Sequence, residues 1–235
     1  MGGSLPVKPF WNFWKSMIAC VLLAGMLTSC GLFDRLGFDT YDYMSETVTQ
    51  TYSDDSETAV MLEELLMVLV TDSHVLTTFD SMSEAIPAYR DAVLEYLLAS
   101  DYAKYSGNTK LIERATKVYP EYHITQVIPE LEFESAMYRH FGGDVMITHE
   151  DGYKFRYLSE AGVYVPMLTT TEHRYYADVT ALAETEKTYR VRFSVKSRPE
   201  EDSTPLESEE YFALVIKRED GTLYIKKLLH GNEVQ

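Results

Sequence analysis

The chain has 235 residues, 46% of them hydrophobic, and a formal net charge of -16 at pH 7. This length suits one domain with its own core. So acidic a chain is a poor partner for nucleic acid, whose phosphates would repel it, and we interpret the acidity as a source of solubility. The two cysteines, Cys20 and Cys30, both lie near the start, so the rest of the chain has no disulfide and no Cys/His zinc pattern.

The first charged residues, Lys8 and Lys15, are basic, and an apolar run of about 11 residues follows them at 17–27. This layout is typical of an export signal. The run is shorter than the roughly 20 apolar residues that a membrane-spanning helix needs. We therefore expect residues 1–29 to be a signal peptide that is removed. The alternative is an uncleaved signal anchor in which Cys30 is incidental.

The sequence Leu27-Thr28-Ser29-Cys30 directly after this run resembles the lipobox of bacterial lipoproteins. The resemblance implies cleavage before Cys30 and attachment of diacylglycerol to its thiol. It also implies a lipid-anchored protein on the extracytoplasmic face of the cell membrane, of the kind found in Gram-positive bacteria. Two lipid chains at about 0.8 kcal/mol per buried CH₂ hold such a protein stably on a membrane.

Residues 30–56 are rich in Asp, Ser, Thr and Tyr, which predicts a polar tether. A short arm packed on the domain is the alternative, because Phe38, Tyr41, Tyr43 and Val48 are unusually apolar for a linker. Helical spacing of apolar residues then predicts a helix at 57–71 and another from about Ser83 to about 104. Further helices are expected at 109–119 and at 130–141, where Gly142-Gly143 ends the last one.

Beyond Gly143 the apolar period changes from helical to alternating. The sequence predicts a hairpin of 145–148 with 153–158 around Asp151-Gly152, and a second one of 211–219 with 222–229 around Asp220-Gly221. In the second hairpin, a two-residue loop places Phe212 opposite Leu229 and Ile216 opposite Ile225. Phe212, Leu214 and Ile216 are expected on the core side. Other strands are predicted at 122–128, 163–166, 174–184 and 189–196, and residues 198–208 form a polar loop.

Helices followed by an antiparallel meander predict a single α+β domain at 57–235, with the N-terminal helices packed on one face of a curved sheet. This order, with the terminal strand Asp-Gly-Thr-Leu-Tyr-Ile-Lys-Lys-Leu, resembles the NTF2-like (cystatin-like cone) superfamily as it occurs in exported proteins. The resemblance rests on element order and supplies no catalytic residue. The long helical half departs from the family pattern.

Signatures of common enzyme and cofactor sites are missing from the sequence. No P-loop, dinucleotide fingerprint, Gly-x-Ser-x-Gly or His-Glu-x-x-His occurs, so no cofactor or metal is expected. His140, His149 and His173 could meet acidic neighbours in a metal site, but turn and loop positions favour solvated side chains.

Cations on the predicted sheet form the candidate site. Arg190, Arg192 and Lys196 project from the polar face of one strand, and Lys217 and Lys226 from the face of the last hairpin that is predicted to point away from the core. If these strands are neighbours, they form a basic surface for an anionic partner such as a wall polymer, a peptide carboxylate or an acidic protein. The alternative is a solvated face whose cations pair with nearby carboxylates.

We therefore predict a membrane-anchored lipoprotein whose non-enzymatic domain binds a ligand or protein at the cell envelope. Two alternatives stay open. One is an enzyme of isomerase or dehydratase type that uses an NTF2-like pocket. The other is a regulator of wall-remodelling enzymes that acts through a loop or a sheet edge.

Overall fold

A computed structural model describes residues 42–71, 73, 75–143, 145–168, 175–197 and 209–233. The predicted signal, Cys30 and the predicted loop at 198–208 lie outside these residues. The chain divides into two compact units, Met1–Asp42 and Tyr43–Gln235, and every element below belongs to the second.

The second unit is a mixed domain of helices and antiparallel strands. Its helices are α3 (Glu57–Val70), α4 (Met82–Ser100), α5 (Tyr102–Ser106), α6 (Thr109–Val118) and α7 (Glu130–Phe141), with 3-10 turns η1 (Tyr43–Ser45) and η2 (Gly231–Glu233). Its strands are β1 (Gln50–Tyr52), β2 (Ile128–Pro129), β3 (Phe155–Leu158), β4 (Val163–Pro166), β5 (Tyr175–Glu184), β6 (Thr188–Ser197), β7 (Glu210–Lys217) and β8 (Leu223–His230).

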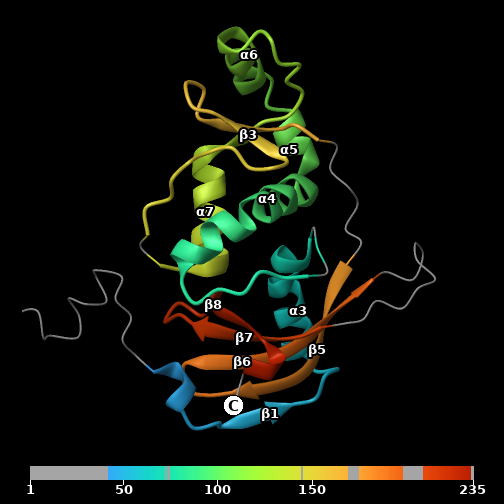
Figure 1. Ribbon diagram of the computed structural model, residues 1–235, viewed down its shortest axis with the longest axis vertical. Helices are drawn as coiled ribbons and strands as arrows, with labels where there is room; N and C mark the ends of the chain where they lie inside the picture. Colours follow the sequence, from blue (N-terminus) through green and yellow to red (C-terminus); the bar gives the residue numbers. More distant parts are fainter. Residues whose placement is uncertain are drawn as a thin grey trace, which may run out of the picture. The chain divides into compact units, whose positions relative to one another are not determined.

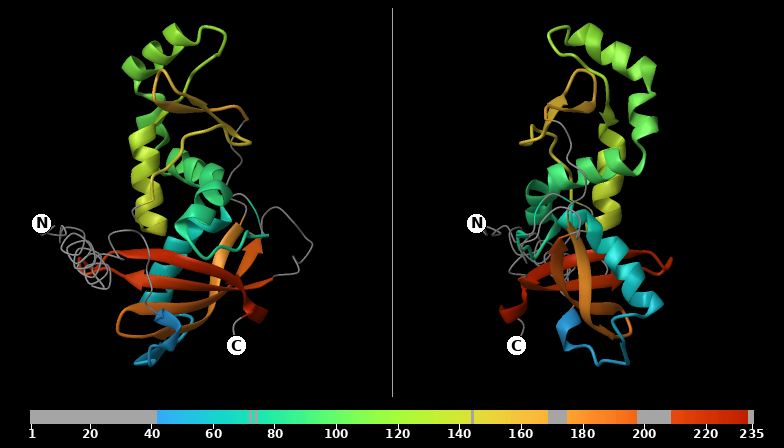
Figure 2. Two further views of the ribbon diagram at one scale, coloured as in Figure 1. Left: turned by 60° about the vertical axis from the view of Figure 1, so that its left-hand side comes forward. Right: turned by 90° about the vertical axis from the view of Figure 1, so that its right-hand side faces the viewer.

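The strands form two antiparallel sheets, one of five strands in the order β1-β5-β6-β7-β8 and one of three in the order β2-β4-β3. Helix α3 lies against β5 on one face of the larger sheet (Figure 1). Strand β1 precedes α3 in the sequence, yet pairs with β5 after it. Helices α4–α7 and the smaller sheet are therefore a long insertion between α3 and β5, and α7 packs against β8 (Figure 2).

The predicted helix at 57–71 is confirmed as α3. Its N-cap is Ser56, whose hydroxyl accepts the backbone N–H of Ala59 at 3.1 Å. Its buried side chains recur at helical spacing and join the main core, which is shared with α4, α7 and β5–β8. Part of the predicted tether also contacts the domain, because η1 and β1 lie within residues 43–52.

The second predicted helix, from about Ser83 to about 104, is interrupted. Asp101 leaves helical geometry and ends α4, and its carboxylate then accepts the Lys104 N–H at 3.0 Å and caps the short helix α5. The two remaining helical predictions correspond to α6 and α7, and Gly142 ends α7 with a φ of 66°.

The predicted hairpin around Asp151-Gly152 is wrong. Strand β3 pairs instead with β4, which follows it, and 145–150 form no strand. Side chains of α4 hold the loop in another conformation. Arg90 Nη1 donates to the Asp151 carbonyl at 3.0 Å, and Asp91 Oδ2 accepts the backbone N–H groups of Tyr153 and Lys154 at 2.7 and 3.0 Å. These bonds occupy backbone groups that a hairpin turn would use.

The predicted terminal hairpin forms, but its register is only partly right. Phe212 faces Leu229 as predicted, whereas Ile216 faces Tyr224 in place of Ile225. The loop has three residues and ends on Gly221 with a φ of 83°, which is typical of a three-residue turn. This shifts the pairing by one residue, and an irregularity between Leu214 and Val215 restores it.

The predicted core side of β7 is also wrong. Tyr211, Ala213 and Val215 enter the main core, while Phe212, Leu214 and Ile216 form a smaller cluster on the other face. That cluster includes partly buried side chains from η1 and β8: Tyr43, Tyr224 and Leu229. Both faces of β7 are therefore apolar and buried, so alternation along this strand did not identify the core side.

Candidate functional site: a gap in the three-stranded sheet

Strand β2 is short because its pairing with β4 ends early. Ile128 faces Tyr164 and Pro129 faces Val163. Continuing this register would place Gln126 opposite Pro166, which has no N–H to donate to a neighbouring strand. Within the described part of the chain, no backbone hydrogen bond joins 122–126 to 165–167. The predicted strand at 122–128 is therefore wrong except at its last residue.

The two backbone segments enclose a cavity, which we call the sheet gap. Its volume is about 300 Å³, at the small end of the range for ligand pockets. One wall is the non-helical segment at 122–126, and the other consists of β4, the residue after it and Arg156 of β3. The described residues that line the gap include no carboxylate: they are Tyr122, His123, Ile124, Thr125, Gln126, Arg156, Val165, Pro166 and Met167.

Arg156 provides the positive charge in this wall. Its guanidinium carbon lies 5.1 Å from the centre of the Tyr122 ring, and Nη1 donates to the Tyr122 hydroxyl. Nε is 3.6 Å from Asp151 Oδ2, too far for a hydrogen bond, and has no hydrogen-bond partner among the described residues. Of the five N–H donors on this guanidinium, only one therefore makes a hydrogen bond within the described chain.

The gap also borders a small second core. Leu158, Val163 and Val165 pack there against Ala115 of α6 and against Ile124. Arg156 and Tyr122 are held between this core and solvent, since both side chains are only partly exposed. The position of the guanidinium thus follows from the packing around it as well as from its contact with Tyr122.

A second polar cluster lies where α7 meets the smaller sheet. His149 Nδ1 is 3.1 Å from the Tyr164 hydroxyl, and its Nε2 is 2.9 Å from Glu134 Oε1. The imidazole stacks on the Tyr157 ring with centroids 5.0 Å apart. Tyr157 donates to Glu130, and burial together with this hydrogen bond raises the pKa of Tyr157 to about 12.

This Glu–His–Tyr chain leads into the protein interior. Tyr164 is completely buried, and burial raises its pKa well above the ordinary value, so its hydroxyl stays protonated. His149 is not the solvated side chain that its loop position predicted, because it bridges α7 and β4. These hydrogen-bonded side chains of Glu134, His149 and Tyr164 therefore hold α7 against the smaller sheet. Among the described residues, no group of His, Cys, Asp and Glu could hold a metal ion, and His173 lies outside them.

The five predicted cations do not share one face of the sheet. Arg190 and Arg192 pair with Leu214 and Phe212, so they lie on the face opposite the main core. Lys217 lies on the other face, where its Nζ is 2.8 Å from Glu184 Oε1 and 5.1 Å from the centre of the Tyr189 ring.

Partners within the chain engage at least four of these cations. Arg190 donates to the carbonyls of Tyr43, Met44 and Glu46 at 3.2, 2.8 and 2.7 Å. Arg192 is 3.2 Å from Glu210, and Lys196 pairs with Asp178. Two hydrogen bonds lower the pKa of Glu184: the larger effect comes from the one donated by Lys217, and the smaller from the one donated by Tyr52. Lys226 lies between Ile225 and Lys227 at the irregularity in β8, and its side chain is partly buried.

Comparison of the chain with protein-family models, with curated proteins and with solved structures finds no match. Among the described residues, no helix is both long and apolar enough to cross a membrane.

Sequence reasoning did not identify Arg156 or Tyr122 as site residues. The available signal was Pro166, which predicts the edge or the end of a strand. It did not show which segment would lie beside Pro166, because 122–126 and 165–167 are far apart in the sequence.

Proposed function

We propose that this protein is a lipid-anchored, extracytoplasmic lipoprotein whose domain binds a partner at the cell envelope without catalysing a reaction. The observation that supports the anchor is the lipobox-like Leu27-Thr28-Ser29-Cys30 directly after a short apolar run. Cys30 is also the only cysteine that follows the proposed cleavage site.

A binding role is supported by the composition of the sheet gap. An arginine, a tyrosine and apolar side chains line it, which are groups that recognise ligands. General acid–base catalysis would need a carboxylate or histidine placed to transfer a proton. The described lining offers only His123, an exposed side chain.

The NTF2-like (cystatin-like cone) assignment belongs to the same proposal. It is supported by α3 lying against a sheet in which β5, β6, β7 and β8 follow one another as an antiparallel meander. The insertion of α4–α7 and the smaller sheet between α3 and β5 departs from a simple helix-plus-meander order.

The anchor is tested by Cys30→Ala, with Cys20→Ala as the matched control because Cys20 lies inside the proposed signal. Cys30→Ala should abolish the lipid found by mass spectrometry, and should release the domain from membranes or leave the precursor uncleaved. Cys20→Ala should change neither. A Cys30→Ala protein that is still cleaved and stays on membranes, with no lipid on the wild type, would contradict the proposal.

A further inference from the structure

We propose that the sheet gap binds the carboxylate end of an extended peptide. This inference names a ligand class for the binding role proposed above, and it does not depend on the lipid anchor. The backbone around the gap, the charge in its wall and its size each support it.

The backbone of β4 presents an acceptor to the gap. Met167 N–H donates to the Lys154 carbonyl at 2.7 Å, so the backbone polar groups of Met167 point toward β3. Hydrogen-bonding direction alternates along a strand, so the carbonyl of Pro166 points the other way, into the gap. A peptide strand lying in the gap would donate an N–H to this carbonyl.

The opposite wall has unused backbone groups. Residues 123–126 belong to no helix or strand, and their N–H groups donate no backbone hydrogen bond within the described chain. The next residue, Val127, donates to the Tyr105 carbonyl at 3.2 Å, on the side of α5. An extended peptide satisfies such groups by adding a strand, which is a common mode of peptide recognition.

The charge in the wall fits one carboxylate. Arg156 forms an ion pair with Asp151 at 3.6 Å, but only one of its N–H groups donates a hydrogen bond within the described chain. A guanidinium binds a carboxylate through two parallel hydrogen bonds. Arg90 and Arg190 also have an unpartnered Nε, but each donates two or more hydrogen bonds to carboxylates or carbonyls of the chain. Arg156 is the only arginine or lysine among the described residues that line the gap, and the whole chain has a formal net charge of -16. A singly charged group therefore fits better than a polyanion.

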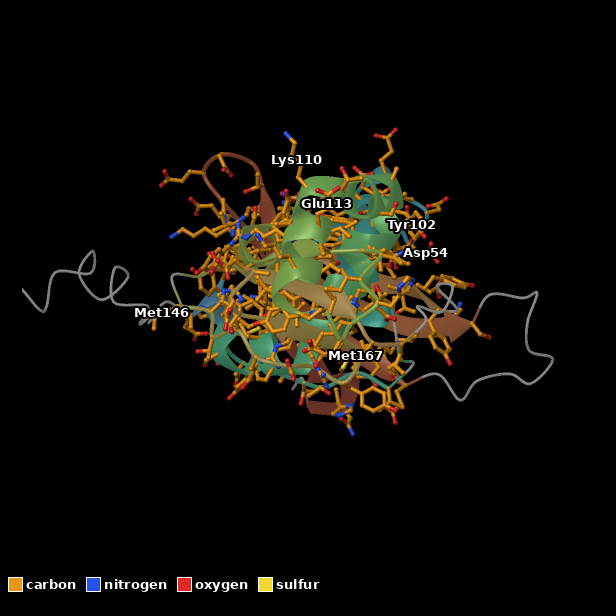
Figure 3. The ribbon with its side chains drawn as sticks, turned by 90° about the horizontal axis from the view of Figure 1, so that it is seen from above. Asp54, Tyr102, Lys110, Glu113, Met146 and Met167 are labelled. Carbon is orange, nitrogen blue, oxygen red and sulfur yellow. The ribbon has the colours of Figure 1, made fainter. Side chains whose placement is uncertain are left out.

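The size of the gap suits a chain end. A volume of about 300 Å³ is small for a drug-sized ligand, and apolar walls from Ile124, Val165 and Met167 would receive one terminal side chain. Met167, labelled in Figure 3, is 41% exposed, so a peptide could enter beside it. Met167 and its neighbour Leu168 are both exposed, and they would contact the residues that precede the terminus.

The test uses the ¹⁵N-labelled full chain and a mixture of N-acetylated tripeptides with all side chains represented at each position. One preparation has free C-terminal carboxylates and the other has C-terminal amides. We expect the free acids at millimolar concentration to shift the amide signals of 122–126 and 165–168. Amides should bind at least about tenfold more weakly, because a charge-assisted hydrogen bond is lost.

Arg156→Gln should weaken binding of the free acids at least about tenfold, and Arg139→Gln, the matched control on the exposed surface of α7, should not. Arg156→Lys keeps the charge without the fork of the guanidinium, so it should bind more weakly than wild type even if Arg156→Gln fails to fold.

Four outcomes would overturn the inference. They are the absence of shifts with the free acids, equal affinity for acids and amides, wild-type affinity in Arg156→Lys, and equal shifts at the gap with acetate or inorganic phosphate alone. The last would show a simple anion site. None of these results bears on Cys30, so failure here is distinguishable from failure of the proposed anchor.

Discussion

The buried imidazole of His140 should make the stability of this protein depend on pH. His140 lies on α7, is only 5% exposed, and meets the Tyr96 ring edge-on with centroids 5.3 Å apart. Its Nδ1 has no hydrogen-bond partner among the described residues. Burial, and to a lesser extent the charge of Arg139, lowers the pKa of His140 from 6.5 to about 4.

The sign of the effect follows from proton binding. Below pH 6.5 the unfolded chain protonates this histidine, while the folded protein excludes the proton until about pH 4. The unfolded state therefore binds more protons in this window, and the free energy of unfolding falls as the pH is lowered. The difference between the two pKa values corresponds to about 3 kcal/mol in full, of which about 2 kcal/mol is lost between pH 7 and pH 5.

The measurement is urea unfolding of the wild type and of His140→Phe at pH 7, 6 and 5. Phenylalanine removes the unpartnered nitrogen in a similar shape, so the variant should be about as stable as wild type at pH 7. It should lose about 2 kcal/mol less than wild type between pH 7 and pH 5. His123→Phe, the control at an exposed histidine, should keep the wild-type dependence. Parallel pH curves for wild type and His140→Phe would refute the reasoning.

Two further predictions concern the contacts that α4 makes with the loop before β3. Lys154→Ala should lower the free energy of unfolding, measured with urea, by about 3 kcal/mol, because Glu95, only 4% exposed, loses its ion pair at 2.8 Å. The double variant Lys154→Met with Glu95→Leu should recover most of that loss, because it removes both buried charges. Asp91→Ala should cost about 1–3 kcal/mol and should raise hydrogen exchange at the Tyr153 amide, whereas a loop that keeps wild-type protection would show that this carboxylate does not hold it.

Local signals in the sequence were enough for most of the helices. The helix predicted at 57–71 forms with Ser56 as its N-cap, and Gly142 ends α7 as predicted. The break at Asp101 was missed because its side chain serves α5, a helix too short to show a period of its own.

Errors among the strands arose where distant residues decide the local structure. Asp151-Gly152 has the composition of a hairpin turn, but Arg90 and Asp91, about sixty positions earlier, bind this loop. Composition alone cannot distinguish a two-residue turn from the three-residue turn that places Gly221 at a φ of 83°. The sheet gap was missed for a related reason: Pro166 predicts that pairing stops, but not what lies across from it.

The pairing of β1 with β5 has a consequence for how the chain folds. Thr49, beside β1, donates through its hydroxyl to the carbonyl of Glu184, 135 positions later. Strands β5–β8 pair with sequence neighbours, and such local contacts form quickly, whereas closing a long loop is slow. During synthesis, β1 therefore has no strand to pair with until β5 has been synthesised. Until β1 docks, the edge of β5 at Leu182–Glu184 remains open to other strands, so this three-residue strand covers that part of the sheet edge against association edge to edge.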